Sequence, residues 1–319
     1  CILRILVTGA FGSLGFSAVP ALLRAGHSVR CFDLSTRSNR RKARKLKNCV
    51  EILWGDIRDQ EAVARAVGDQ EVVIHCAALL PPLSDSQPDL AREVNVNGTK
   101  LLIQEVNRIS TKPRIIYPSS VTVFGVNQHL PPPRTVEDPV QATDNYSQHK
   151  ILCEELIRES GLDWLIMRIG VAVDAKLKKA DSEILKRMFE VSLDNRLEYV
   201  HPEDVALAMT NALDCARAWN KILLIGGGPR CQIRQRDLFK ASFSAIGLKP
   251  LPDAAFGKQA YYTDWMDTSE SQKYLQYQRH SFGDFRKQAH REMRFARWAL
   301  FSIHPLVRWW LLRHSEAWK

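Results

Sequence analysis

The 319-residue sequence lacks any long uninterrupted hydrophobic run. Its longest nearly uncharged apolar stretch, Trp298 to Leu312, is interrupted by His304, Pro305 and Arg308 and is too short to span a bilayer. Low-complexity tracts are also missing, and 45% hydrophobic, 25% charged and 8% aromatic residues make an ordinary globular composition. Disordered, collagen-like and coiled-coil architectures are therefore excluded. The length fits one large α/β domain with a small appendage, or two unequal domains.

The cysteines show no spacing that is typical of metal ligands. There are seven of them, an odd number, which predicts reduced thiols, a cytoplasmic location and no metal site. The sequence opens on an apolar strand, without a basic segment followed by a cleavable apolar region, so secretion is not predicted.

Positive charge is plentiful but concentrated in two segments. The formal net charge is +10; residues 34–50 hold seven Lys or Arg and no acid, and residues 286–319 hold eight against Glu292 and Glu316. A nucleic-acid binder would normally carry its positive charge along one working face of a recognisable module, and no such module is visible. We therefore expect a small-molecule substrate and no nucleic-acid partner.

The first half of the chain alternates short apolar runs with amphipathic stretches at the spacing of βαβ units. Strands are predicted at residues 2–7, 28–32, 51–54, 72–75, 114–117 and 164–169, and helices at 14–24, 60–67 and 92–109. This pattern predicts a doubly wound parallel sheet.

The remaining sequence predicts three regions of different character. We expect a dinucleotide-binding core at residues 1–170, a smaller C-terminal substrate-side lobe at 171–288, and a basic, tryptophan-rich tail at 289–319. Residues 198–225 are expected to return to the core as a short helix and a strand, and further helices are expected near 235–246 and 268–297.

A glycine-rich turn lies where the first predicted strand gives way to the first helix. Gly9, Gly12 and Gly15 permit a tight turn and close approach of a pyrophosphate to backbone N–H groups, including those of Phe11, Ser13 and Leu14. Glycine-rich turns are common, but here a strand precedes the turn and a helix follows it. Asp33, an acid at the end of the second strand, completes the pattern of a Rossmann-type dinucleotide site.

Asp33 favours NAD over NADP, because its carboxylate can accept the adenosine ribose hydroxyls and would repel a 2′-phosphate. NADP is not excluded, since Arg37, Arg40 or Arg41 from the basic segment can reach such a phosphate. Further cofactor contacts are expected after the third and fourth strands, from Asp56, Ile57, Ala77 and Ala78.

Tyr146 and Lys150 lie four residues apart on a predicted helix and therefore share one face. An ammonium group near a phenol favours the phenolate, so we expect Lys150 to lower the pKa of Tyr146 and make it a general acid/base. Such a pair is common by itself. Ser119 and Ser120, however, are predicted at the carboxyl end of a strand, which is the ligand-binding edge of such a sheet.

As an ordered set these motifs resemble the extended branch of the short-chain dehydrogenase/reductase superfamily, which contains epimerase/dehydratase and 3β-hydroxysteroid-dehydrogenase-like enzymes. The resemblance rests on TGAFGSLG at 8–15, Asp33, GDIRD at 55–59, HCAA at 75–78, NVNGT at 95–99, SSVTVFG at 119–125, YSQHK at 146–150 and YVHPEDVA at 199–206.

The resemblance implies a role for each matching residue. Tyr146 is expected to be the proton donor or acceptor, Lys150 to bind the nicotinamide ribose, and Ser120, with Ser119 as the second choice, to bind the reacting oxygen. It also implies that Asn97 is a structural residue below the site and that residues 201–204 lie where the chain re-enters the core. His75 is interpreted as a packing residue at a strand end.

Departures from the family pattern narrow the expected chemistry. Dehydratases of this branch carry an acidic pair directly after the catalytic hydroxyl, where this chain has Val121 and Thr122. Residues 168–173 lead into a basic stretch with no obvious seat for a nucleotide sugar. We therefore expect an NAD-dependent oxidoreductase that interconverts a secondary alcohol and a ketone on a hydrophobic substrate, such as a steroid or lipid. A nucleotide-sugar 4-epimerase that uses tightly bound NAD and a non-catalytic dinucleotide-binding scaffold are the alternatives.

The tail combines four tryptophans, Trp298, Trp309, Trp310 and Trp318, with arginines and apolar residues. This composition is typical of a helix lying in an anionic membrane interface, and Pro305 predicts two short helical pieces rather than one. The alternative is a helix docked on its own domain or on a second subunit of a homodimer.

Overall fold

Seven parallel strands form the central sheet, in the order β3-β2-β1-β4-β5-β6-β8. The computed structural model describes residues 1–46, 48–173, 182–300 and 303–318. The strands are β1 (Arg4–Thr8), β2 (Ser28–Asp33), β3 (Glu51–Trp54), β4 (Val72–His75), β5 (Arg114–Ser120), β6 (Trp164–Ile169) and β8 (Lys221–Ile225). The strand order reverses between β1 and β4, which is where open α/β sheets bind their ligands. The predicted fold class is confirmed.

Helices cover both faces of this sheet and enclose two hydrophobic cores. One core contains side chains of α1 (Ser13–Arg24), α9 (Pro202–Ala212) and α11 (Ser269–Leu275). The other contains side chains of α3 (Gln60–Val67), α6 (Gly98–Asn107) and α7 (Asn145–Arg158). Strands β1, β4 and β6 are mostly apolar because both of their faces are buried.

Two expected helical regions are divided into shorter elements. Residues 92–109 contain the end of α5 (Pro88–Arg92), a π-helical turn η2 (Glu93–Asn97) and α6. Residues 268–297 contain α11, α12 (Phe282–Glu292) and most of α13 (Arg294–Leu300). Helix α11 ends because Gln276 adopts left-handed backbone angles, after which Tyr277 turns into the core and is fully buried.

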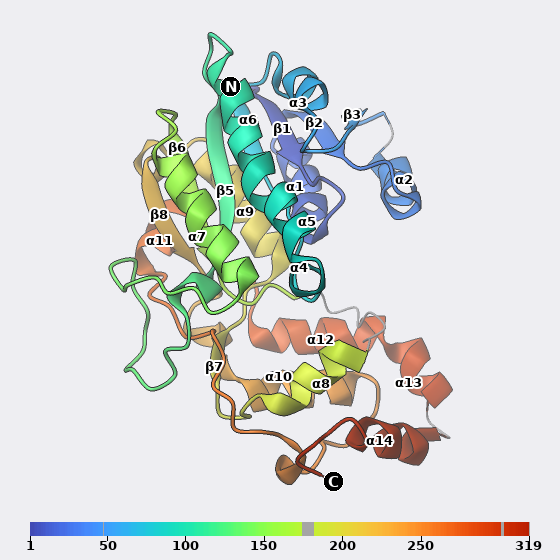
Figure 1. The fold of residues 1–319 in the computed structure, drawn as a ribbon. Coiled ribbons are helices and arrows are strands. Elements are labelled where there is room, and N and C mark those ends of the chain that lie inside the picture. The colour runs from blue at the N-terminus through green and yellow to red at the C-terminus, as the bar shows by residue number, and fades with distance from the viewer. Residues whose placement is uncertain (47, 174–181, 301–302, 319) are drawn as a thin grey trace.

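A smaller lobe lies beyond the carboxyl edge of the sheet (Figure 1). It contains a two-stranded antiparallel sheet of β7 (Arg196–Glu198) and β9 (Gln232–Arg234). Its helices are α8 (Ser182–Glu190), α10 (Gln235–Ala245), α12, α13 and α14 (His304–Leu312). Between β7 and β9 the chain returns to the body of the molecule, where α9 packs against α1 and β8 forms the sheet edge.

The remaining short elements connect these parts. They are α2 (Arg37–Ala43), α4 (Leu83–Ser86), and the 3₁₀ turns η1 (Arg44–Leu46), η3 (Val121–Phe124), η4 (Ala216–Ala218), η5 (Pro229–Cys231) and η6 (Asp253–Ala255). Within the described ranges, no helix has both the length and the apolar character needed to cross a membrane.

Candidate active site

The glycine-rich turn brings β1, α1 and the segment after β4 into close contact. Gly9 has a φ of +61°, and a Cβ there would lie 2.7 Å from the backbone of Ala77. A Cβ on Gly15 would lie 2.3 Å from the carbonyl oxygen of Gly9. Side chains are therefore excluded at both positions, as the close packing of a dinucleotide-binding turn requires.

The N-terminus of α1 is suited to a pyrophosphate. Gly12 is its N-cap and supplies no side-chain hydrogen bond, so this residue leaves the first-turn N–H groups, which include those of Ser13 and Leu14, for a ligand to satisfy. Together with the turn, this arrangement fits the dinucleotide predicted from the sequence.

Asp33 lies at the end of β2, beside the glycine-rich turn. Its carboxylate accepts hydrogen bonds from the backbone N–H groups of Phe11 at 2.8 Å and Leu34 at 2.7 Å, and from Asn39 Nδ2 at 3.1 Å. Burial raises the pKa of Asp33, while the two backbone bonds and the charge of Lys42 oppose that shift. The carboxylate is thus held next to the first turn of α1, where an adenosine ribose is expected.

The basic segment after β2 contributes Lys42 to this region. The Lys42 Nζ atom donates to the carbonyl oxygen of Phe11 at 2.5 Å and lies 5.4 Å from the ring centroid of Phe16. Arg37, Arg40 and Arg41, singled out from the sequence, are exposed. The sequence offered no way to choose Lys42, because only the turn of α2 brings it back over the glycine-rich turn.

The other expected cofactor contacts occupy loops at the same edge. Asp56 accepts hydrogen bonds from Arg58, which lowers the pKa of Asp56, and Ile57 is buried against Gly98. Ala77 and Ala78 follow β4 and are partly exposed, and the Ala77 N–H donates to Thr8 Oγ1 at 3.3 Å.

Ser120, Tyr146 and Lys150 are brought together at the carboxyl end of β5. Helix α7 starts at a capping box between Asp144 and Ser147, which places Tyr146 in its first turn and Lys150 one turn later. Lys150 Nζ donates to the carbonyl oxygen of Pro118 at 2.6 Å and lies 5.6 Å from the Tyr146 ring centroid.

The ionisation of the pair differs from the expectation. Burial and the charge of Asp144 raise the pKa of Tyr146, whereas a hydrogen bond with Ser120 acts in the opposite direction. Burial lowers the pKa of Lys150 to about 8. The prediction that the pKa of Tyr146 is lowered by Lys150 is therefore wrong, because the pKa is raised. At neutral pH Tyr146 is a protonated phenol, which is the form of a proton donor.

The hydroxyl of the neighbouring residue Ser119 is directed to Glu154. Ser119 Oγ donates to Glu154 Oε1 at 2.5 Å, and Glu154 forms a buried ion pair with Arg168 at 2.8 Å. These three side chains tie β5, α7 and β6 together. Since Ser119 is 4% exposed and already engaged, Ser120 is the hydroxyl that remains at the sheet edge.

His75 is a buried packing residue, as interpreted from the sequence. Its ring nitrogens lie 2.7 Å from Thr8 Oγ1 and 2.9 Å from Thr99 Oγ1, and burial lowers the pKa of His75 to about 3. The ring therefore stays neutral and links β1, β4 and α6.

The structural role expected for Asn97 belongs to Asn95. Asn95 is buried, accepts from the Leu79 N–H at 2.7 Å and donates to the Leu79 carbonyl at 3.0 Å. Asn97 is exposed and bonds to Glu93. The expectation for Asn97 is thus wrong. Asn95 and Thr99 lie four residues apart, a spacing that places them on one face of a helix, and this spacing was the signal in the sequence that could have pointed to Asn95.

The lobe contributes side chains to this edge that the sequence did not reveal. Tyr261 donates to the hydroxyl of Tyr262 at 2.9 Å, and Tyr262 is hydrogen-bonded to Asp144 at the start of α7. Arg187 of α8 pairs with Asp85 of α4 at 2.7 Å. No local pattern could predict the contact of Tyr262 with Asp144 or that of Arg187 with Asp85, since the latter pair is 102 positions apart.

A histidine cluster joins the lobe to the body of the molecule. His201, Glu203 and His280 could offer metal ligands within 4.8 Å of one another. However, His201 Nδ1 accepts from the Glu203 N–H at 3.2 Å to cap α9, and its Nε2 pairs with Gln288 at 2.8 Å. Both ring nitrogens of His201 are thus engaged in hydrogen bonds within the protein rather than left for a metal. They lie at the point where the chain was expected to re-enter the core.

Residues 5–226 match the family model described as the NAD dependent epimerase/dehydratase family. The chain belongs to that family. The family-level resemblance seen in the sequence is confirmed, and so is the expected class of NAD-linked enzyme at the level of the family.

Curated relatives include proteins of different activity. The chain is 33% identical over 172 residues to sterol demethylase protein B of Methylococcus capsulatus, covering 53% of this chain and 51% of the relative. It is 27% identical over 205 residues to 3 beta-hydroxysteroid dehydrogenase/Delta 5→4-isomerase of Mycobacterium tuberculosis, covering 61% and 53%. It is 30% identical over 176 residues to UDP-glucose 4-epimerase 2 of Arabidopsis thaliana, covering 51% and 49%. The chain spans about half the length of the curated relatives it matches.

Solved structures share the fold over nearly the whole chain. UDP-glucose-4-epimerase from Stenotrophomonas maltophila, with bound NAD and formylated UDP-arabinopyranose, has a TM-score of 0.75 at 21% identity and covers 93% of this chain and 99% of its own. A short-chain dehydrogenase/reductase superfamily protein from Agrobacterium tumefaciens with bound NAD has a TM-score of 0.73 at 19% identity, covering 95% and 99%. At these identities the likeness shows the fold.

Proposed function

We propose that this protein is an NAD-dependent oxidoreductase that interconverts a secondary alcohol and a ketone on a hydrophobic substrate. The observation that carries the proposal is the meeting of Ser120, Tyr146 and Lys150 at the sheet edge, beside the glycine-rich turn and Asp33. Bound NAD would supply the acceptor or donor of a hydride.

Tyr146, Ser120 and Lys150 have different roles in the proposed reaction. In the reducing direction, the protonated Tyr146 donates its proton to the carbonyl oxygen while Ser120 orients that oxygen through a hydrogen bond. In the oxidising direction the proton returns to Tyr146. Lys150, held by the carbonyl of Pro118, lies one turn away and is assigned to the cofactor ribose.

Three observations support a hydrophobic substrate. Leu80 and Leu83 follow β4 at the ligand edge and are 51% and 40% exposed. Arg168, an obvious cation for a phosphate, is buried in its pair with Glu154. Two relatives are named for a sterol or a steroid. Most of the basic stretch that follows residue 173 in the sequence lies outside the described residues.

A nucleotide-sugar 4-epimerase is the second candidate, because UDP-glucose 4-epimerases are among the relatives and the same three side chains would serve a transient oxidation. The two functions differ in one measurable property. A dehydrogenase shows net formation or loss of NADH with turnover, whereas an epimerase returns its cofactor unchanged.

The decisive test is a panel of secondary alcohols and ketones followed at the NADH absorbance band, with matched variants. Tyr146→Phe should lower turnover roughly a hundredfold or more, the scale of general acid–base catalysis, with nearly normal NAD affinity. Lys150→Ala should lower both turnover and the affinity for NAD. Tyr274→Phe, which removes a hydroxyl on α11, is the control. If Tyr146→Phe keeps most of its activity, the assignment is wrong, and epimerised product without net NADH would favour the second candidate.

We also propose that the protein works in the cytoplasm with its C-terminal helices on an anionic membrane surface. The support is the exposure of Phe295, Trp298 and Trp309, which are 71%, 82% and 58% exposed, among arginines. Each cation near such a surface contributes about 1 kcal/mol, which fades as salt rises. Sedimentation with anionic and neutral vesicles tests the contact. A second copy of the chain is the alternative occupant, and a dimer that ignores vesicles would establish it.

A further inference from the structure

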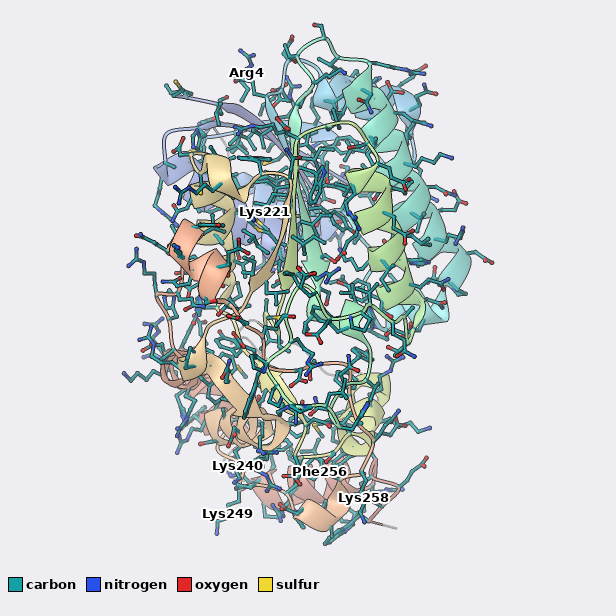
Figure 2. All side chains as sticks on the ribbon, turned by 90° about the vertical axis from the view of Figure 1, so that its left-hand side faces the viewer. Arg4, Lys221, Lys240, Lys249, Phe256 and Lys258 are labelled. Atoms are coloured by element: carbon teal, nitrogen blue, oxygen red, sulfur yellow. The ribbon has the colours of Figure 1, made fainter. Side chains whose placement is uncertain are left out.

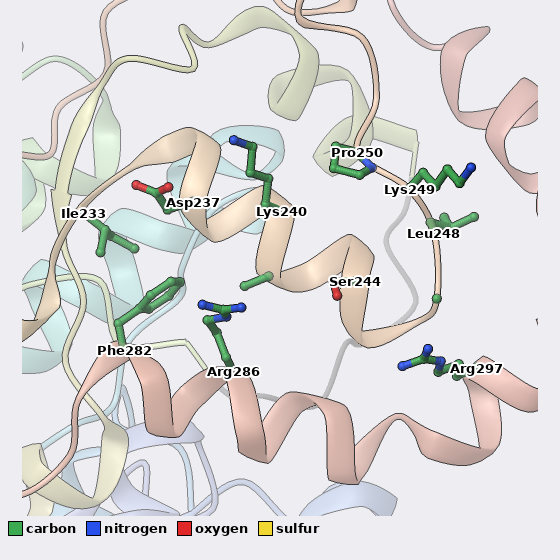
Figure 3. A pocket seen from close by; sticks show the side chains of 12 residues that line it. Ile233, Asp237, Lys240, Ser244, Leu248, Lys249, Pro250, Phe282, Arg286 and Arg297 are labelled. Atoms are coloured by element: carbon green, nitrogen blue, oxygen red, sulfur yellow. The ribbon is translucent and has the colours of Figure 1, made fainter.

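A pocket of about 550 Å³ lies on the lobe, away from the sheet edge. It is lined by α10, α12, α13 and the loop after α10. Figure 3 shows Arg286 rising from α12 towards α10, while Arg297 turns towards the same space from α13. The volume falls in the range of small-ligand sites. Nothing in the proposed reaction uses this pocket.

The lining of the pocket is strongly cationic. Lys240, Lys249, Arg286 and Arg297 contribute side chains, and Asp237 is the one acid among the lining residues. Across the described ranges, none of these four cations forms an ion pair with a carboxylate. The Asp237 carboxylate is occupied, because it accepts from the Arg234 N–H at 3.0 Å and caps α10. With four cations against one carboxylate, the pocket therefore presents a net positive charge to an anion.

The base of the pocket is apolar. Ala241, Leu248 and Phe282 line it and are all buried. At one end Gly247 has a φ of +82°, and a Cβ there would lie 3.1 Å from Arg297 Cγ and 2.9 Å from His304. The absence of a side chain at Gly247 lets α13 and α14 close this end, so that Arg297 reaches the pocket.

The pocket adjoins the exposed aromatic face of the C-terminal helices. Arg297 lines the pocket, while Phe295 and Trp298 on the same helix are exposed to solvent. Figure 2 places Lys240 and Lys249 on the lobe, at the end of the molecule opposite Arg4. At a membrane surface, anionic headgroups lie next to the apolar boundary. The cations would therefore face the headgroups while the neighbouring aromatic side chains contact the apolar boundary.

We propose that this pocket binds the phosphate headgroup of an anionic phospholipid, with Arg286 and Arg297 as its principal donors and the apolar base against the glycerol and first methylenes. Guanidinium groups suit phosphate because they donate paired, charge-assisted hydrogen bonds. The inference rests on the proposed membrane contact and deepens it, since it adds recognition of a headgroup to a general attraction. Free phosphate has the same charged chemistry and is the other possible source.

The test compares full-length variants on phosphatidylcholine vesicles that carry either phosphatidic acid or phosphatidylserine at equal surface charge. We expect wild-type protein to bind the phosphatidic acid vesicles roughly tenfold more tightly, because a terminal phosphate accepts more hydrogen bonds from the two arginines. Arg286→Gln should remove that preference. Arg291→Gln removes the same charge from α12 outside the pocket lining and should preserve it. Lys240→Gln is the second pocket variant, and thermal unfolding verifies that each variant is folded.

Three outcomes separate the pocket from the membrane contact. If vesicles bind but the Arg286→Gln and Arg291→Gln variants keep the same preference, the pocket proposal is overturned and the membrane contact stands. If no vesicle binds but soluble dioctanoyl phosphatidic acid binds wild type and not Arg286→Gln, the pocket stands and the membrane contact is wrong. If inorganic phosphate binds as tightly as that lipid in calorimetry, free phosphate replaces lipid as the ligand and the proposal is overturned.

Discussion

At the scale of single residues, we expect the choice between NAD(H) and NADP(H) to depend on Asp33. Its carboxylate lies beside the first turn of α1, where it would accept ribose hydroxyls and repel a 2′-phosphate. We expect NAD(H) to bind more tightly than NADP(H), and the Asp33→Asn variant to lose most of that preference because the repulsion disappears. Titration of both proteins with both cofactors measures it.

Tighter NADP(H) binding by the wild type would reverse this assignment. The structure indicates which cation would then be responsible. Lys42, rather than the exposed Arg37, Arg40 or Arg41, lies near Asp33 and the Phe11 carbonyl. A Lys42→Gln variant that weakens NADP(H) binding alone would confirm that explanation.

Lys150 carries a stability cost that depends on pH. Burial lowers the pKa of Lys150 from 10.5 to about 8, so the folded chain binds fewer protons than the unfolded chain between those values. Its contribution to the free energy of unfolding therefore rises as pH rises from 8 to 10.5. A shift of this size corresponds to about 3 kcal/mol.

The Lys150→Met variant isolates this effect, because it keeps the length of the side chain without the charge. Urea unfolding of both proteins from pH 7 to 10.5 should show the wild type gaining about 3 kcal/mol relative to the variant. Lys249→Met, which changes an exposed lysine, is the control. A wild-type-to-Lys150→Met difference that does not change with pH would show that Lys150 is not a buried cation.

At the scale of elements, α13 and α14 reconcile two expectations for the tail. The chain forms two short helices, as Pro305 predicted, with this proline at the start of α14. One side of α14 packs into the lobe, where Leu311 is 5% exposed, and Ser315 Oγ donates to the Ala255 carbonyl at 2.5 Å. The other side leaves Leu306 66% exposed. The tail is therefore docked on its own lobe and still presents an apolar surface.

This docking decides how the tail must be studied. Removing residues after 288 would uncover the core that Leu311 and its neighbours fill, and loss of vesicle binding could then come from unfolding. Substitution of an exposed side chain such as Trp298 leaves that core intact. It is therefore the cleaner way to weaken the membrane contact.

At the scale of the whole molecule, the proposed reaction site lies between the sheet edge and the lobe. The body supplies the glycine-rich turn, Ser120, Tyr146 and Lys150, and the lobe supplies Tyr262 against Asp144. The pair between Asp85 and Arg187 joins the two parts near the same edge. The cationic pocket lies elsewhere on the lobe, so one lobe could both shape the substrate site and hold the protein on a surface.

Local spacing was enough to predict most of the body. Strand runs with apolar residues on both faces, a glycine-rich turn between a strand and a helix, and an acid after the second strand each depend on neighbours within one βαβ unit. The sheet and the positions of Gly9, Gly12, Gly15 and Asp33 in it could therefore be read from the chain. Tyr146 and Lys150 share a helix face for the same reason.

Burial and long-range contacts decided the rest, because they depend on which distant segments pack together. They turn Ser119 towards Glu154 and leave Ser120 at the edge, make Asn95 rather than Asn97 the buried residue, and select Lys42 from a run of cations. They also reverse the expected shift in the pKa of Tyr146, because burial and the charge of Asp144 raise it. The sequence alone predicts which residues can act, whereas the packed structure sets their charge, orientation and partners.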